Sequence, residues 1–141
     1  MMIPTLSVKQ PGASLIAQGK KTIETRLWGT AYRGPLVICS SREPRDQGPV
    51  GRALCIVMVK SCRPMTEADE AAARCEIYER AIAWHFGKVW PVMSFAMRGQ
   101  RGIFPLSVPE YVFVTPEDRH EVRAALEWSR RNGLLKYIKE K

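Results

Sequence analysis

Two unbroken apolar runs constrain the fold of this chain most strongly. Residues 35–39 read Pro-Leu-Val-Ile-Cys, and residues 53–59 are apolar at every position. Both runs are short and rich in β-branched residues, so we expect them to be strands. Successive side chains of a strand point to opposite faces, so a strand that is apolar throughout is buried on both. The two runs therefore predict the inner wall of a small barrel, with residues 52–62 as its central strand.

Further strands and turns are expected around this wall. Residues 5–9 alternate between polar and apolar side chains, and short apolar segments recur at residues 89–95, 102–108 and 111–114. Glycine and proline punctuate the sequence between them, as in turns and loops. Strand-rich segments interrupted by a few helices predict an α+β fold, a small closed or partly closed β-barrel with helices packed outside.

The strongest helix pattern covers residues 65–86. Thr66 is a suitable N-cap, acidic residues follow it, and Gly87 is a suitable stop. Apolar residues recur at spacings of three and four, which predicts a stripe facing the core: Ala68, Ala71, Cys75, Tyr78 and Ile82. Glu76 and Glu79 lie off this stripe, so we expect them to face solvent.

A second helix is expected to begin after Thr115 and to stop at Asn132-Gly133. Its inward stripe would contain Val122, Ala125, Leu126 and Ser129. The chain shows no repeat, linker or low-complexity segment, so we expect residues 1–141 to form a single domain. Residues 115–141 would be its C-terminal helix and basic tail.

Composition narrows the possible partners. The chain of 141 residues has a formal net charge of +8, which favours polyanions such as nucleic acid. No run approaches the ~18 apolar residues of a membrane span, and the first residues lack the pattern of a secretory signal. We therefore expect a cytoplasmic protein that does not bind a membrane.

The cysteines and histidines do not predict a metal site. The four cysteines form no C-x-x-C pair, and His85 and His120 stand far apart in the chain. We expect no metal and no cofactor. Cys39 and Cys55 fall in the strand runs and Cys75 falls on the helical stripe, so burial is the expected role of all three.

Charged residues are concentrated in residues 19–26, Gly-Lys-Lys-Thr-Ile-Glu-Thr-Arg. Gly19 is suited to end a short helix that begins near Gln10-Pro11. Residues 22–28 alternate as a strand does, so Glu24, Arg26 and Trp28 share one face. Such a cluster is either a set of exposed ion pairs or a site in which Glu24 holds Lys21 and Arg26 ready for a ligand.

Gly19, Lys21, Glu24 and Arg26 reproduce the G-x-K-x-x-E-x-R motif, and the chain resembles the ASCH domain family of the PUA-like superfamily. The resemblance extends from residue 5 to about residue 108. It includes the blocks at residues 6–11 and 32–38 and the Arg98-Gly99 element at residues 97–104. It implies a PUA-like barrel in which the strand after the first helix lines a cleft.

The resemblance implies binding of RNA or a nucleotide as one function. In this hypothesis Arg26 and Arg33 pair with phosphate, Tyr32 stacks on a base, and Glu24 orients the cations. Gln10 would offer its amide to a base edge or serve as a helix cap. The remaining candidate binding residues lie along the expected cleft: Lys9, Ser40, Arg98 and Gln100.

An enzyme is the alternative hypothesis. Some small ASCH-like proteins are amidohydrolases of N4-acylated cytidine that use a lysine, a threonine and a glutamate. Lys21 matches the lysine, but Glu24 stands where the threonine would fall. The third residue would come from the helix expected at residues 65–86, where Glu76 and Glu70 are the candidates. A modified nucleoside would then be the substrate, with Lys21, Glu24 and Glu76 as catalytic residues.

Overall fold

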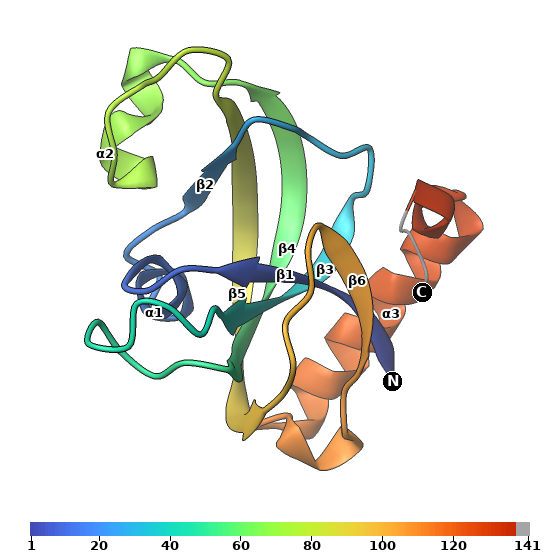
Figure 1. The fold of residues 1–141 in the computed structure, drawn as a ribbon. Helices are drawn as coiled ribbons and strands as arrows, with labels where there is room; N and C mark the ends of the chain where they lie inside the picture. The colour runs from blue at the N-terminus through green and yellow to red at the C-terminus, as the bar shows by residue number, and fades with distance from the viewer. Residues whose placement is uncertain (138–141) are drawn as a thin grey trace.

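Six strands form one sheet that curls into a half-barrel in the computed structural model, which describes residues 1–137 (Figure 1). The strand order is β2-β5-β4-β3-β1-β6. Neighbouring strands are antiparallel except for the parallel pair β1 and β3. The strands are β1 (Met2–Val8), β2 (Ile23–Arg26), β3 (Gly34–Ser40), β4 (Arg52–Pro64), β5 (Ile82–Ala96) and β6 (Ile103–Ser107).

Within residues 1–137, three α-helices and three single turns of 3-10 helix accompany the sheet. Thr115 caps the longest helix, α3, because its hydroxyl accepts a hydrogen bond from the backbone N–H of Asp118 at 3.0 Å. α3 packs against β3, and α1 contacts β1, β3 and β4. The helices are α1 (Gly12–Ala17), α2 (Glu70–Ala73) and α3 (Pro116–Arg131), and the 3-10 turns are η1 (Glu67–Asp69), η2 (Glu110–Val112) and η3 (Leu134–Tyr137).

β3 is buried at every position because apolar clusters cover both of its faces. Leu36 and Ile38 belong to a cluster that includes Ile16 of α1, whereas Val37 belongs to a second cluster that includes Val122 of α3. The alternation follows from the period of two along a strand. The predicted double burial of this strand and the predicted α+β barrel fold are confirmed.

The half-barrel is open between its two edge strands, β2 and β6. A side chain bridges part of this opening: the guanidinium Nη2 of Arg26 on β2 donates to the backbone oxygen of Ser7 on β1 at 2.7 Å. The charged face of β2 therefore lies at the mouth of the sheet, where a cleft can form.

The predicted long helix at residues 65–86 is wrong beyond Ala73. Arg74 takes a left-handed conformation with φ of 61° and ends α2, and residues from Ile82 onward belong to β5. Gly87 therefore lies inside a strand. Cys75 and Tyr78 are exposed rather than buried in a helical stripe. Ile82 to Phe86 pair with the distal half of β4, and this long-range pairing overrides the local helix pattern.

Two smaller expectations also differ at the C-terminal end. The strand expected at residues 111–114 is the 3-10 turn η2 followed by a single bridge between Phe113 and Val92. The inward stripe of α3 is largely confirmed, because Val122, Leu126 and Ser129 are buried. The part of the predicted basic tail at residues 138–141 lies outside the described residues.

Candidate functional site

Lys21 lies at the junction between α1 and β2 and is almost fully buried, with 7% of its surface exposed. Gly19, with φ of +75°, ends the helix, and the backbone N–H of Lys21 donates to the oxygen of Leu15 at 3.1 Å. The Lys21 ammonium donates to the backbone oxygen of Ala73 at 2.5 Å and lies 3.4 Å from Oε1 of Glu24. Both partners are acceptors, so this geometry uses the lysine as a cation.

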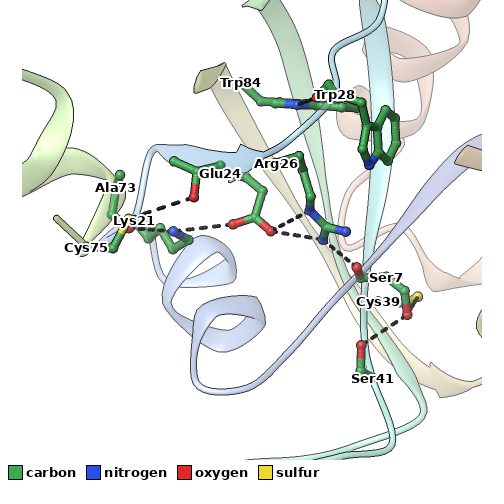
Figure 2. A network of polar contacts seen from close by, with 11 residues as sticks. Ser7, Lys21, Glu24, Arg26, Trp28, Cys39, Ser41, Ala73, Cys75 and Trp84 are labelled. Atoms are coloured by element: carbon green, nitrogen blue, oxygen red, sulfur yellow. Dashed lines mark hydrogen bonds and ion pairs between the residues drawn. The ribbon is translucent and has the colours of Figure 1, made fainter. Parts of the chain in front are cut away.

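Glu24 connects Lys21 to Arg26. Its second oxygen, Oε2, accepts hydrogen bonds from Nε of Arg26 at 3.1 Å and from Nη2 at 2.9 Å. Figure 2 shows the resulting chain of contacts from Lys21 through Glu24 and Arg26 to Ser7. The three charged residues of the motif therefore form one linked cluster, with Glu24 between the two cations.

A cleft of about 740 Å³ opens beside this cluster. The ends of β1, β2 and β3 form one side, and the segment that joins β5 to β6 forms the other. Its lining residues are Ser7, Arg26, Trp28, Ser40, Ser41, Arg42, Gly51, Arg98, Gly99, Gln100, Arg101 and Gly102. A smaller hollow of about 440 Å³ shares Ser7, Arg26 and Ser41 with it and extends to Lys9, Lys21 and Glu24. The two hollows thus form one continuous surface.

The charge of this surface is strongly positive. Lys9, Arg42, Arg98 and Arg101 are exposed, and their side chains make no hydrogen bond or ion pair with any of residues 1–137. Among the described residues that line the two hollows, Glu24 is the one acid, and it already contacts two cations. Four unpaired cations around a concave surface favour a ligand with several negative charges.

Trp28 supplies an aromatic surface to the larger hollow. Its ring meets that of Trp84 edge to face, with centroids 5.0 Å apart and planes at 89°. The indole N–H of Trp84 also donates to the backbone oxygen of Trp28 at 3.0 Å. These contacts fix the ring while 39% of the residue stays exposed.

The prediction that Tyr32 stacks on a base is wrong. It is fully buried, and its hydroxyl donates to the backbone oxygen of Pro35 at 2.5 Å. Burial also raises the pKa of this phenol far above its ordinary value. Arg33 follows it and donates to the backbone oxygens of Thr30 and Tyr32, outside both hollows. This geometry uses Arg33 to hold its own turn.

Gln10 serves as a helix cap and does not offer its amide to a base. Its Oε1 accepts from the backbone N–H of Ser14 at 2.9 Å. Its Nε2 donates to Ser14 Oγ at 2.8 Å and to the backbone oxygen of Pro49 at 2.7 Å. Ser40 is similarly engaged, because its hydroxyl exchanges hydrogen bonds with the backbone of Arg52 at 3.3 and 3.2 Å. Both residues support the walls of the cleft.

Glu76, the expected third catalytic residue, lies in the exposed segment between α2 and β5 rather than on a helix. It is absent from the residues that line either hollow. Glu70 is also engaged, because its carboxylate accepts from the backbone N–H of Ile77 at 2.7 Å. Neither Glu76 nor Glu70 thus supplies a second carboxylate beside Lys21. The amidohydrolase hypothesis stays a prediction.

The cysteines differ in burial. Cys39 and Cys55 are buried as predicted, whereas Cys62 is half-buried and Cys75 is exposed. Burial raises the pKa of the Cys39 thiol, which lies 3.5 Å from Ser7 Oγ next to the cleft. Burial thus disfavours the thiolate, the nucleophilic form of cysteine. Within residues 1–137 no cluster of three or more histidine, cysteine or acidic side chains is placed to hold a metal ion.

The sequence model of the ASCH domain matches residues 6–94, well over half of the chain. The chain belongs to the ASCH domain family. No curated protein sequence matches it. None of the helices described has the length and hydrophobicity needed to span a membrane.

Solved ASCH structures share the fold. The ASCH protein of Zymomonas mobilis is 14% identical, and the match covers 86% of this chain and 93% of that one, with a TM-score of 0.52. A serine-to-alanine mutant of the same protein is 13% identical over 86% of this chain and 94% of that one, with a TM-score of 0.53. A tyrosine-to-phenylalanine mutant matches at 13% identity, 86% and 96% coverage, and a TM-score of 0.52.

Trp28, Arg42 and Arg101 line the cleft but were not among the predicted site residues. The alternation predicted over residues 22–28 put Trp28 on the face of Arg26, so the signal for this residue was present although β2 ends at Arg26. Arg42 and Arg101 lie in segments without regular structure, next to the predicted residues Ser40 and Gln100. Their position depends on how those segments fold back onto β1.

Proposed function

We propose that this ASCH domain binds RNA in the cleft beside the Lys21–Glu24–Arg26 cluster. The observation that carries the proposal is the group of four exposed cations without partners among the described residues, Lys9, Arg42, Arg98 and Arg101, around one concave surface. Phosphates in a row would satisfy several of them at once and release condensed counterions. An aromatic ring beside them suits a base rather than a bare anion.

The motif residues have a positioning role in this proposal. Lys21 and Glu24 are only 7% and 8% exposed, so their contact with a large ligand would be small. Glu24 holds the Arg26 guanidinium in place, and the guanidinium in turn binds the backbone of β1. The cluster thereby fixes β2, and with it Trp28, against the rest of the cleft. Arg26 itself lines both hollows and is the motif residue nearest to a bound phosphate.

Arginine substitutions in the cleft test the proposal. Arg98→Gln should weaken binding of a labelled single-stranded oligoribonucleotide, because one phosphate contact is lost. At about 50 mM salt the expected loss is roughly fivefold to tenfold. Fluorescence anisotropy of the wild type and the variant measures it.

The matched control is Arg119→Gln, which removes an exposed charge from α3. Its affinity should stay within about twofold of the wild type, since a charge outside the contact surface acts mainly through screened long-range attraction. Equal losses in both variants would mean that RNA responds to net charge alone. Absence of RNA binding by the wild type at low salt would contradict the proposal outright.

A further inference from the structure

Gln100 carries a buried acceptor without a partner. Its amide oxygen is inaccessible to solvent and accepts no hydrogen bond from any of residues 1–137. The residue lines the larger hollow. In the sequence it stands between two of the unpaired arginines, Arg98 and Arg101. Buried polar groups in folded proteins nearly always have a hydrogen-bond partner. We therefore expect a ligand to supply the donor for this oxygen.

The backbone holds Gln100 in this position. Gly99 lies so close to β1 that a Cβ there would stand 2.8 Å from Ser7 Oγ, and Gly102 takes a φ of +67°. The backbone N–H of Met97 donates to the oxygen of Gly51 at 3.0 Å. These contacts hold the backbone of the segment beside β1 and Gly51, so Gln100 stays at the wall of the larger hollow.

Trp28 lines the same hollow and is equally well fixed. The edge-to-face contact with Trp84 and the hydrogen bond from its indole hold the residue before any ligand arrives. Figure 2 shows Trp28 next to Arg26, at the outer end of the charged cluster. A fixed aromatic ring loses little conformational freedom when a flat group stacks on it.

A flat ligand with hydrogen-bonding edges satisfies both residues. Every unpaired nucleobase has a π face for an indole, and every one has an N–H on its edge that can donate to a buried oxygen. In a duplex the face is stacked and the Watson–Crick edge is paired, so a base in a helix has no free π face for the indole. Phosphate alone offers no N–H donor to Gln100.

We propose that Trp28 and Gln100 form a subsite for one unpaired nucleobase, with the ring stacked on the indole and its edge donating to the amide oxygen once the Gln100 side chain turns toward the base. The inference rests on the proposed function and extends it: the ligand is single-stranded, and the cleft recognises a base as well as phosphates. Arg98 and Arg101, on either side of Gln100 in sequence, bind the phosphates that flank this nucleotide.

Three probes test the subsite: an oligoadenylate of about eight nucleotides, an abasic oligomer of the same length and charge, and a duplex RNA of the same length, which carries about twice that charge. Wild-type protein should bind the oligoadenylate at least about tenfold more tightly than the other two. Trp28→Ala should remove this preference, because oligoadenylate then binds no more tightly than the abasic oligomer binds to the same variant. Trp28→Phe should keep most of it, because a phenyl ring also stacks.

Gln100→Met keeps the size of the side chain and removes its hydrogen bonds. It should lower the affinity for oligoadenylate several-fold more than that for the abasic oligomer. Trp128→Ala and Gln18→Met are matched controls, since both residues lie outside the two hollows and should leave all three affinities unaltered. Thermal unfolding of each variant verifies that it is folded.

The outcomes separate the two proposals. If the abasic oligomer binds as tightly as oligoadenylate, or if Trp28→Ala and Gln100→Met both leave the preference intact, the subsite is overturned while phosphate binding stands. If none of the three probes binds the wild type, the proposed function fails and the subsite fails with it.

Discussion

Both oxygens of Glu24 contact cations, Oε1 facing Lys21 and Oε2 accepting from Arg26. The side chain is 11% exposed, so water screens these contacts only in part. Lys21 and Arg26 would repel each other without the carboxylate, and both would keep a charge in a poorly hydrated place. At the scale of single residues, the Glu24 carboxylate offsets the repulsion between Lys21 and Arg26 and so allows both to occupy one site.

Glu24→Gln should therefore destabilise the fold by about 1–3 kcal/mol, since charge-assisted hydrogen bonds are lost, and the buried Lys21 and half-buried Arg26 lose their counter-charge. Urea unfolding at neutral pH measures the free energy. Glu79→Gln is the control, because Glu79 is exposed and contacts no cation among residues 1–137. A variant at residue 24 as stable as that control would show that the cluster adds nothing to stability.

The contrast between Tyr32 and Trp28 shows which side-chain positions a local sequence pattern can predict. An aromatic beside an arginine suggested that Tyr32 stacks on a base, yet it is buried beneath α3. Ser129, from that helix, donates to the backbone oxygen of Arg33 at 2.7 Å. No local pattern reveals a contact between residues 33 and 129. The alternation predicted over residues 22–28, by contrast, is local, and Arg26 and Trp28 do line the same hollow.

At the scale of elements, Gln10 connects two pieces of the cleft wall. Its amide caps α1 through Ser14 and holds the segment at residues 42–51 through the oxygen of Pro49. The fit is close, because a Cβ at Gly48 would stand 2.9 Å from the Gln10 amide nitrogen. The segment that carries Arg42 is thus positioned from the start of α1.

Gln10→Met should lower the unfolding free energy by about 1–3 kcal/mol, because its three hydrogen bonds are lost together. Hydrogen exchange should accelerate in residues 42–51 in particular, since the bond to Pro49 is what ties them to α1. Exchange followed by mass spectrometry measures this. Unchanged protection of that segment would show that other contacts hold it.

Asp69 connects the turn of η1 to β4 through hydrogen bonds. Its carboxylate accepts two hydrogen bonds from Arg63, both at 3.0 Å, and one from the backbone N–H of Thr66 at 2.8 Å. The Arg63 guanidinium first, and the Thr66 N–H second, hold the pKa of this carboxyl below its ordinary value. The charged form is therefore bound more favourably in the folded state than in the unfolded chain.

The stability that Asp69 adds is fully present above the unfolded pKa of about 3.9, and it is lost as pH falls through the lower folded value. Asp69→Asn cannot titrate, so the wild type should exceed it in Tm at pH 7, and the gap should narrow toward pH 3. Thermal unfolding across this range measures the gap. A gap that stays constant with pH would mean that the carboxylate charge is not what matters.

The segment after η1 is also where sequence and structure diverge most. Residues 65–86 carry a cap, acids near the start and a helical apolar period, and the first turns do form. Arg74 and Arg80, at φ of 61° and 64°, then turn the chain back to pair with β4. Burial of Trp84 between strands decides the outcome, and that depends on β4 being already in place. The apolar runs of β3 and β4 were predictable because they need no such context.

At the scale of the whole molecule, the arginines fall into two groups, those paired with acids and those without such partners among residues 1–137. Three arginines of α3 are paired with acids, Arg123 with Glu110 and both Arg130 and Arg131 with Glu127. The arginines of the cleft at residues 42, 98 and 101 have no such partners among residues 1–137. The net charge of +8 alone could not separate these groups, because pairing depends on tertiary placement.

The most direct measurement is the salt dependence of single-stranded RNA binding by two triple variants. One changes Arg42, Arg98 and Arg101 to Gln, and the other changes Arg123, Arg130 and Arg131 to Gln, so both lose the same charge. If the cleft binds phosphates, the slope of log affinity against log salt should fall by about 2 in the first variant, near 0.7 per contact, and stay close to wild type in the second. Equal slopes in the two variants would contradict an RNA site in the cleft.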